Sequence, residues 1–442
     1  MKAPVFNRLN SLQIFQVLRF GAPFIVSIIL VRLLDQQSIG LFESLTLIGT
    51  SFSFFWVSGV INTFIPYYHS IEEEKRPVLI FNVFALLVCL SLFCFLVLMT
   101  LKPVFFNHAR MSIQSAKAFQ GHLYFYFLLY NLFNAPSFFM EYLLMVKNRP
   151  KAVVGYGVFS FSIQILSLTT PLFLGAPLEV AVLVLAGGSF LKFLLLSGYV
   201  SKISKAVFSF ELIKVFLNKA TPAILTLVVG GSMPYIDSYI VLHFFDKPIF
   251  AVYQYGAREM PLVLLMANAL SNVFSGDIAK SHIEQNVPES LEKLKQGSKR
   301  LMHRLFPLTI ILIICSRFLF SHVYSSAFIG AAAIFNVFML MTVSRLIFPQ
   351  TVMAGLLKNK QMLLFGGIEW IINLVLDFVF LYWFGLIGIA YATVIAYYVE
   401  RAIQVNYLNK IGYAPKYYIP LKVWGVYSLV VIGVYVLGVI RN

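Results

Sequence analysis

Charged side chains inside long apolar runs are the residues of this sequence that could bind a charged ligand. The clearest case is Y-G-A-R-E-M-P-L-V-L-L, residues 255–265, where Arg258 and Glu259 stand side by side. Arg258 follows Pro248 by ten residues, which is about 15 Å along a helix. At that depth in a bilayer an arginine that faces lipid costs several kcal/mol. It must therefore face the protein interior, a water-filled cavity or a counter-charge.

Two placements of Arg258 satisfy this requirement. In the first, it lines a substrate cavity together with Asn272, which lies fourteen positions on and nearly on the same helical face. In the second, it forms a structural ion pair with an acidic residue of a neighbouring span, for which Glu43 and Asp237 are the candidates. Glu43 is also a candidate for the lining of the cavity. We expect the cavity, because arginines near the middle of a membrane span are seldom only structural.

Three further basic residues lie in apolar runs. Arg19 is well inside the first run, where a cavity role and a packing role are both open. Arg32 is three residues from Asp35, so snorkelling and a local ion pair account for it, with a cavity role as the alternative. Lys192 is ten residues from Lys202, and we expect its side chain to reach toward the membrane interface.

Acidic and amide residues form two stripes at helical spacing. Glu369, Asn373 and Asp377 share one helical face, and we expect this stripe to pair with Arg317 and Arg345 as packing inside one lobe. The second stripe comprises Asn131, Asn134 and Glu141. A proton-coupling or cation-coupling role stays open for Glu141, Asp237 and Glu369.

The elements that must position these side chains are membrane-spanning helices. The 442 residues are 60% hydrophobic and 12% charged, so a soluble fold could not cover its apolar surface. A bilayer core takes about 20 apolar residues of helix, and such stretches recur along the chain. We predict thirteen spans, at residues 12–34, 42–68, 78–101, 120–146, 152–174, 178–201, 221–245, 249–276, 305–324, 327–357, 362–384, 386–408 and 418–440.

The net charge of +16 follows the positive-inside rule. With the N-terminus in the cytoplasm, 23 of the 34 basic residues fall in cytoplasmic segments, so the charge predicts topology and excludes nucleic acid as a partner. The first apolar run leads directly into Arg32 without a cleavage pattern, which indicates a retained helix. We therefore expect a multi-pass protein of an inner-type membrane, in contact with its lipids.

The sequence carries no pattern of an enzyme. The three cysteines lie in predicted spans, and the seven histidines are scattered singly, without the spacing of a metal site. No phosphate-binding loop, nucleophile elbow or dinucleotide fingerprint is present. We expect no catalytic residue, no cofactor and no metal site.

Two short patterns recur at one offset of 211 residues. Residues 35–42 (D-Q-Q-S-I-G-L-F) match 246–253 (D-K-P-I-F-A-V-Y), and 147–149 (K-N-R) match 358–360 (K-N-K). They predict an all-α polytopic fold of two six-helix lobes in the same orientation, with a substrate cavity between them that opens to one side at a time. The expected parts are a lobe at 1–201, a basic cytoplasmic linker at 202–220, a lobe at 221–408 and an extra span at 409–442.

A cavity lined by arginines suits a phosphate or pyrophosphate group, because the guanidinium fork matches phosphate geometry. If that group heads a lipid, the tail remains in the bilayer while the polar part crosses inside the cavity. This is the physical basis of a flippase.

Five stretches along both halves of the chain carry a family resemblance. They are R-L-L-D-Q-Q-S-I-G-L-F (32–42), S-G-V-I-N-T-F-I-P-Y-Y (58–68), P-Y-I-D-S-Y-I-V (234–241), Y-G-A-R-E-M-P-L (255–262) and F-G-L-I-G-I-A-Y-A-T-V-I-A (384–396). In their order and spacing they resemble the polysaccharide-flippase branch of the multidrug/oligosaccharidyl-lipid/polysaccharide (MOP) superfamily. The resemblance implies two six-helix bundles in a V in a bacterial inner (plasma) membrane. As in Wzx-type members, it implies outward movement of an undecaprenyl-pyrophosphate-linked sugar repeat unit for O-antigen (lipopolysaccharide) or capsule synthesis. It places Asn62 among the cavity candidates, and Arg258 matches a cavity-facing arginine of the lipid II flippase branch.

Three other functions stay open. A lipid II flippase shares the proposed pyrophosphate chemistry. A cation-coupled drug exporter of the same superfamily would be expected to have an acidic cavity, and the basic residues argue against it. A membrane glycan polymerase or ligase would need a longer outer segment than 102–119.

Overall fold

A computed structural model describes residues 8–107, 122–258, 261–284 and 286–440 of the protein. Glu259 and most of the predicted outer segment 102–119 lie outside the described residues. Within those ranges every regular element is helical, which confirms the predicted all-α fold.

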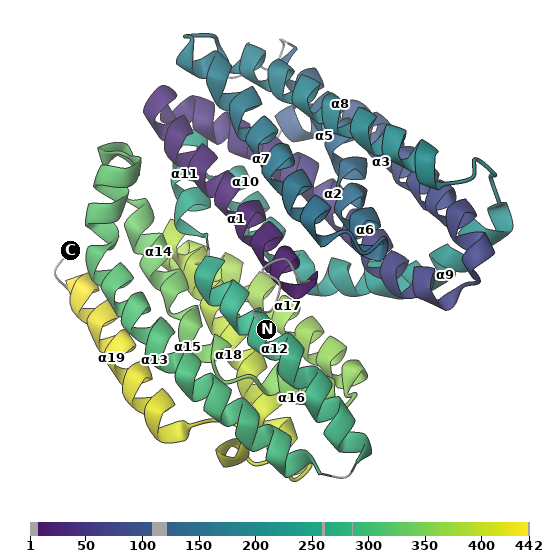
Figure 1. Cartoon of the computed structure of the whole chain (residues 1–442). Coiled ribbons are helices and arrows are strands. Elements are labelled where there is room, and N and C mark those ends of the chain that lie inside the picture. Colours follow the sequence, from purple (N-terminus) through teal and green to yellow (C-terminus); the bar gives the residue numbers. More distant parts are fainter. Residues whose placement is uncertain (1–7, 108–121, 259–260, 285, 441–442) are drawn as a thin grey trace. The chain divides into compact units, whose positions relative to one another are not determined.

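The chain divides into two compact units, Met1–Ala251 and Val252–Asn442, each described here by itself (Figure 1). The division into lobes at the linker 202–220 stays a prediction. The first unit holds α1 (Arg8–Leu33), α2 (Gln36–Ser70), α3 (Arg76–Asn107), α5 (Leu123–Ser137), α6 (Phe139–Val146), α7 (Pro150–Phe173), α8 (Leu178–Ile203), α9 (Phe210–Gly231), α10 (Met233–Phe244) and the start of α11 (Lys247–Gly256). The second holds the end of α11, α12 (Pro261–Ile283), α13 (Val287–Leu319), α14 (Ala331–Met339), α15 (Met341–Arg345), α16 (Pro349–Gly355), α17 (Asn359–Phe384), α18 (Leu386–Lys410) and α19 (Leu421–Ile440).

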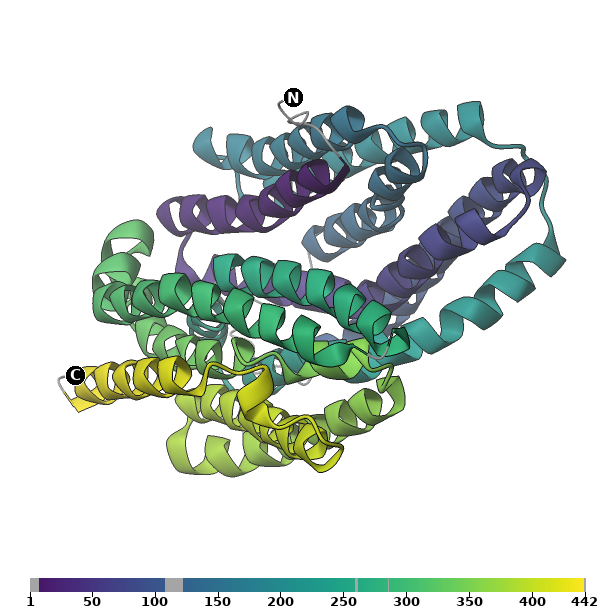
Figure 2. The same cartoon turned by 60° about the horizontal axis from the view of Figure 1, so that its bottom comes forward.

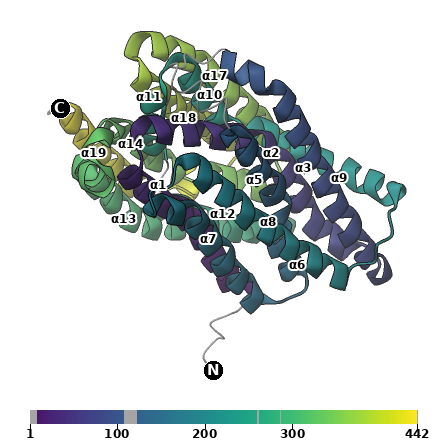
Figure 3. The same ribbon diagram turned by 90° about the horizontal axis from the view of Figure 1, so that it is seen from above.

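In the first unit, α5 packs against both α3 and α8, and Figure 3 shows these three helices grouped together. The helix α1 packs on α7, and α2 packs on α9. A buried cluster that includes Trp56, Phe64 and Phe139 joins α2 to α6.

In the second unit, α17 and α18 form a tight helical pair. The helix α13 contacts α12 on one side and α19 on another, and the yellow α19 can be followed in Figure 2. The core of this unit includes Met302 of α13, Val352 of α16 and Val431 of α19, so the extra helix α19 is connected to the same core as α13 and α16.

The protein is a multi-pass membrane protein. Among the described residues, ten helices are long and apolar enough to cross a membrane, and twelve if each of two bent pairs is one span. The predicted span 120–146 corresponds to α5 and α6, which are separate short helices.

Four predicted spans are broken, so the expectation of continuous helices at 120–146, 221–245, 249–276 and 327–357 is wrong. The axis bends by 49° between residues 210–228 and 233–244, and by 44° between 331–345 and 349–355. Proline is the physical reason, since it lacks a backbone N–H and its ring displaces the preceding turn. Each of the four spans has a proline at or beside a break, namely Pro136, Pro234, Pro261 and Pro349.

The break between α5 and α6 is compensated by a side chain of another helix. Pro136 cannot donate to the carbonyl of Leu132, which lies four residues earlier. The hydroxyl of Ser91 on α3 donates to that carbonyl instead, at 2.8 Å. The break therefore leaves no unpaired acceptor at Leu132.

The breaks between α14, α15 and α16 are compensated in the same way. Each of three backbone carbonyls in this region accepts a hydrogen bond from a side chain of a neighbouring helix. The donors come from α18, α19 and α13: Tyr398 Oη to Leu340 O at 2.6 Å, Trp424 Nε1 to Val343 O at 2.9 Å and Ser298 Oγ to Leu346 O at 2.7 Å.

Only a short segment separates α8, which ends at Ile203, from α9, which begins at Phe210. The intervening backbone is fixed by the amide of Asn82 on α3. Asn82 Nδ2 donates to Val207 O at 2.8 Å, and its Oδ1 accepts from the Ser209 N–H at 2.9 Å.

The structure contains internal repetition in its turns. Asn148, between α6 and α7, and Leu357, between α16 and α17, both have left-handed backbone angles, with φ of 54° and 58°. Gly175 and Gly385, which follow α7 and α17, also have positive φ. The separation between Asn148 and Leu357 is two residues shorter than the offset of 211 between the two Lys-Asn motifs.

Replacing Ser298 by Ala should lower the free energy of unfolding by about 1–3 kcal/mol, because the Leu346 carbonyl loses its side-chain donor inside a buried region. Thermal or denaturant unfolding of purified protein in detergent measures this. Ser316→Ala on the same helix is the matched control. The Ser316 hydroxyl is also buried but bonds only to Ile313 O of its own helix, so its loss should cost less than about 1 kcal/mol. Equal losses for the two variants would contradict the assigned role of Ser298.

Candidate functional site

Arg258 lies just after the end of α11, in the non-helical stretch before α12. Its guanidinium carbon is 4.6 Å from the centroid of the Tyr255 ring. Tyr255 is buried and stacks on Phe328, with 5.3 Å between the two centroids. The half-buried arginine is therefore held on an aromatic base.

Ala257 and Arg258, which follow α11, are not helical. Non-helical backbone at membrane depth is tolerated only where it is buried in protein or lines a water-filled cavity. The break thus agrees with a cavity position for Arg258, which stays a prediction. The expectation that Arg258 and Asn272 share one face of a continuous helix is wrong, because Asn272 belongs to α12, where it is exposed, and Arg258 does not.

Arg19 and Glu141, predicted separately as a cavity residue and a coupling residue, form an ion pair. Arg19 Nη2 donates to Glu141 Oε2 at 2.5 Å. The guanidinium carbon of Arg19 also lies 5.2 Å from the ring centroid of Phe15 and 5.6 Å from that of Phe138. Phe138 is the residue at the break between α5 and α6, so the proline-induced bend helps to shape this site.

The other predicted site residues are spread over several helices, and a role in binding or coupling stays a prediction for each. The part of the chain that the structure describes contains no group of three or more His, Cys, Asp or Glu residues that could hold a metal ion. Arg32 is exposed at the end of α1, Asn62 is exposed and Glu43 half-buried on α2, Asp237 is buried on α10, and Glu369 is half-buried on α17.

Lys192 does not reach toward the interface as expected. Its side chain is buried against α5, and its Nζ donates to Asn134 Oδ1 at 2.7 Å. Asn134 belongs to the predicted stripe with Asn131 and Glu141, but the break at Phe138 interrupts that stripe. An amide satisfies part of the ammonium group without neutralising its charge.

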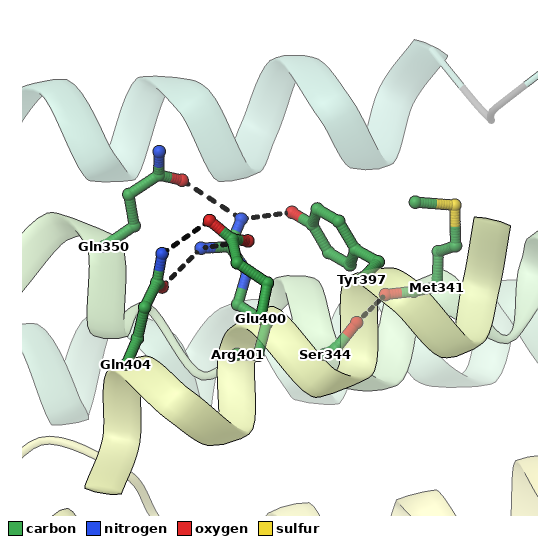
Figure 4. A network of polar contacts seen from close by, with 7 residues as sticks. All are labelled: Met341, Ser344, Gln350, Tyr397, Glu400, Arg401 and Gln404. Atoms are coloured by element: carbon green, nitrogen blue, oxygen red, sulfur yellow. Dashed lines mark hydrogen bonds and ion pairs between the residues drawn. The ribbon is translucent and has the colours of Figure 1, made fainter. Parts of the chain in front are cut away.

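Figure 4 shows a polar network on α18 and α16 that the sequence analysis missed. Arg401 Nη1 donates to Gln404 Oε1 at 2.7 Å, and Nη2 donates to Tyr397 Oη at 2.5 Å and to Gln350 Oε1 at 3.0 Å. Glu400 Oε2 lies 3.5 Å from Arg401 Nη1, and Glu400 Oε1 accepts a hydrogen bond from Gln404 Nε2 at 2.7 Å. Both terminal nitrogens of the buried arginine thus have acceptors.

Arg401, which the sequence analysis counts among the 23 basic residues of cytoplasmic segments, is buried inside a helix. The residue is only 7% exposed and lies in α18, a helix that is long and apolar enough to cross a membrane. A basic residue near the end of an apolar run looks the same in sequence whether it points to water or to protein. The signal that could have found it is the close spacing of Tyr397, Glu400 and Gln404, which share its helix.

Arg345 lies against an aromatic ring of α18, and the pairing of the stripe on α17 with Arg317 and Arg345 stays a prediction. The guanidinium carbon of Arg345 lies 5.0 Å from the centroid of the Tyr397 ring, which also contacts Arg401 at 4.5 Å. In the stripe, Asn373 Nδ2 donates to Asp377 Oδ2 at 2.9 Å. Tyr397 is therefore shared by two arginines.

Replacing Arg401 by Gln should lower the free energy of unfolding by about 3–5 kcal/mol, because it leaves the buried Glu400 carboxylate without its counter-charge. The double variant E400Q/R401Q removes both charges and should recover much of this loss. Unfolding temperature in detergent and protein level in the membrane are the measurements. If the double variant is no more stable than the single one, the ion pair is not what stabilises this region.

No family model matches the sequence, and no curated protein matches it. Solved structures do match. The lipid II flippase MurJ in an inward closed conformation gives a TM-score of 0.70 at 17% identity, covering 97% of this chain and 93% of that chain. The MATE multidrug transporter DinF-BH gives 0.62 at 16% identity, covering 92% and 96%. The MATE transporter VcmN of Vibrio cholerae gives 0.60 at 11% identity, covering 90% and 95%.

These matches extend over nearly the whole of each chain. The sequence identities are low, so the likeness is one of fold. It confirms the MOP-type fold that the resemblance of the sequence implied.

Proposed function

We propose that the protein is a flippase that moves a lipid-linked oligosaccharide, carried on an undecaprenyl-pyrophosphate-type lipid, from the cytoplasmic to the outer leaflet by alternating access. The product would serve O-antigen or capsule synthesis. The observation that carries the proposal is Arg258, a half-buried arginine held on Tyr255 in a helix break of a protein with a transporter fold.

The chemistry of Arg258 favours an anionic cargo. A guanidinium offers several N–H donors in one plane, which suits two phosphate oxygens at once. The Tyr255 ring orients that plane while using none of the N–H donors. Arg19 is a second candidate contact, since its side chain is 27% exposed although Glu141 binds it.

The location in a bacterial inner membrane with a cytoplasmic N-terminus belongs to this proposal and rests on the distribution of basic residues. Coupling to a proton or Na⁺ is also part of it, with Asp237, Glu141 and Glu369 as the candidate residues. No cofactor is invoked.

Lipid II is the second candidate cargo. The observation that favours it is the TM-score of 0.70 with a lipid II flippase. Both cargoes present a pyrophosphate, so Arg258 would have the same role in either case. The MATE transporters share the fold, but a cationic drug would be repelled by Arg258 and Arg19.

Replacing Arg258 by Ala should leave the protein folded and reduce transport about tenfold or more, because one charge-assisted contact to phosphate is lost. Arg258→Lys should retain part of the activity, since lysine keeps the charge but not the fork. The measurement is surface-glycan assembly in a deletion strain complemented with each variant, together with membrane protein level and lipid-linked intermediate on the cytoplasmic side.

The matched control is Arg304→Ala, which removes an exposed arginine of α13 and should leave assembly unchanged. Normal assembly with Arg258→Ala would remove the main support for phosphate binding. Intact surface glycan in the deletion strain itself would favour the drug-exporter function instead. Efflux of organic cations would then be the measurement.

A further inference from the structure

Arg19 is held by the Glu141 carboxylate, the Tyr142 hydroxyl and two aromatic rings. Glu141 binds Nη2 at 2.5 Å, while the rings of Phe15 and Phe138 lie 5.2 Å and 5.6 Å from the guanidinium carbon. Aromatic faces attract a cation without using its N–H donors. The Nε of Arg19 is buried and makes no hydrogen bond. The guanidinium is therefore well placed but retains donor capacity.

The two members of the ion pair differ in access. The side chain of Arg19 is 27% exposed and that of Glu141 only 3%. A ligand can thus reach the arginine, but it cannot reach the carboxylate. Phe138, at the break between α5 and α6, is 37% exposed and forms part of the accessible side.

The groups that face Glu141 contain one cation. They are Arg19 of α1, the Tyr142 hydroxyl of α6 itself and the Tyr156 hydroxyl of α7. From α2, the contact with α6 is aromatic, with Phe64 against Phe139 at 4.8 Å. Among these described neighbours, Arg19 alone can neutralise the carboxylate.

We propose that Arg19 is a ligand of the cargo pyrophosphate, that Glu141 is its resting counter-ion, and that Glu141 takes up a proton when the cargo draws Arg19 away. This inference rests on the proposed function. The N–H groups of Arg19 pass from the carboxylate to phosphate oxygens, and a proton from water binds the freed carboxylate oxygen. No covalent bond of the cargo is made or broken.

The reason for proton uptake is the burial of Glu141. A buried carboxylate that loses its counter-charge is strongly disfavoured and is neutralised by a proton instead. Pyrophosphate competes well for the guanidinium because it carries more charge and accepts two parallel hydrogen bonds. Cargo binding is then linked to one proton, so affinity should rise up to about tenfold for each unit by which the pH falls.

The test is calorimetric titration of purified protein in detergent with farnesyl pyrophosphate, in two buffers of different ionisation enthalpy. The difference in heat gives the number of protons bound. Wild type should take up about one proton for each ligand. Glu141→Gln should take up none, bind several-fold more tightly near neutral pH and lose the pH dependence, because the amide competes weakly for Arg19.

Two variants keep the test independent of misfolding. The double variant R19Q/E141Q leaves no unpaired buried charge, and it should fold, bind about tenfold more weakly than Glu141→Gln and take up no proton. Glu289→Gln removes an exposed carboxylate that pairs with Lys293 at 2.7 Å, and it should behave as wild type.

Inorganic pyrophosphate and farnesol separate the head group from the tail. Proton uptake with inorganic pyrophosphate as well would show that the head group suffices; uptake with the farnesyl compound alone would show that the tail is needed to reach Arg19. Binding without proton uptake, equal uptake by Glu141→Gln, or equal affinity for farnesol would overturn the exchange. If wild type does not bind farnesyl pyrophosphate at all, the proposed function itself fails.

Discussion

A backbone carbonyl inside a membrane needs a hydrogen-bond donor from the protein, because the surrounding hydrocarbon supplies none. This requirement makes the chain helical and decides where its helices can break. At Pro136 the donor to the freed carbonyl is Ser91, and around α14–α16 the donors are Tyr398, Trp424 and Ser298. Each comes from another helix, so a break is stable only in the packed unit. The bends that shape the candidate site at Phe138 thus depend on tertiary contacts.

The charged residues within the helices fall into two groups by their partners. Arg401 and Lys192 are deeply buried, and their hydrogen bonds go to side chains of the same unit. Arg19 and Arg258 are partly accessible and rest on aromatic rings. A charge that is fully surrounded orders the packing around it, whereas one that is oriented by aromatic faces and partly accessible can be reached by an anionic ligand. This difference in access, more than the presence of charge, separates structural from candidate binding residues.

Hydropathy was enough to predict the helical class and the approximate place of the spans, because long apolar runs have no other stable form in lipid. It did not predict the breaks, since a proline inside an apolar run is tolerated when a neighbouring side chain compensates it. The partners of Arg19 and Lys192 are distant in sequence, and one partner of Arg401, Gln350, lies 51 residues away on another helix. Glu141 is 122 residues from Arg19, and no spacing rule connects them. The side chains of the site could be chosen from the sequence, but their pairing could not.

The turns at Asn148 and Leu357 have the same hydrogen bonds, from residue 148 to Met145 O and from residue 357 to Ala354 O, although their side chains differ. Left-handed backbone suits asparagine but costs leucine about 1 kcal/mol. The chain thus keeps a backbone shape in its second half with a residue that resists it. If both halves descend from one duplicated ancestor, the backbone dihedral angles of these turns have stayed similar although the amino acids have diverged. Comparisons of shape will then trace the ancestry of such a protein further than comparisons of letters.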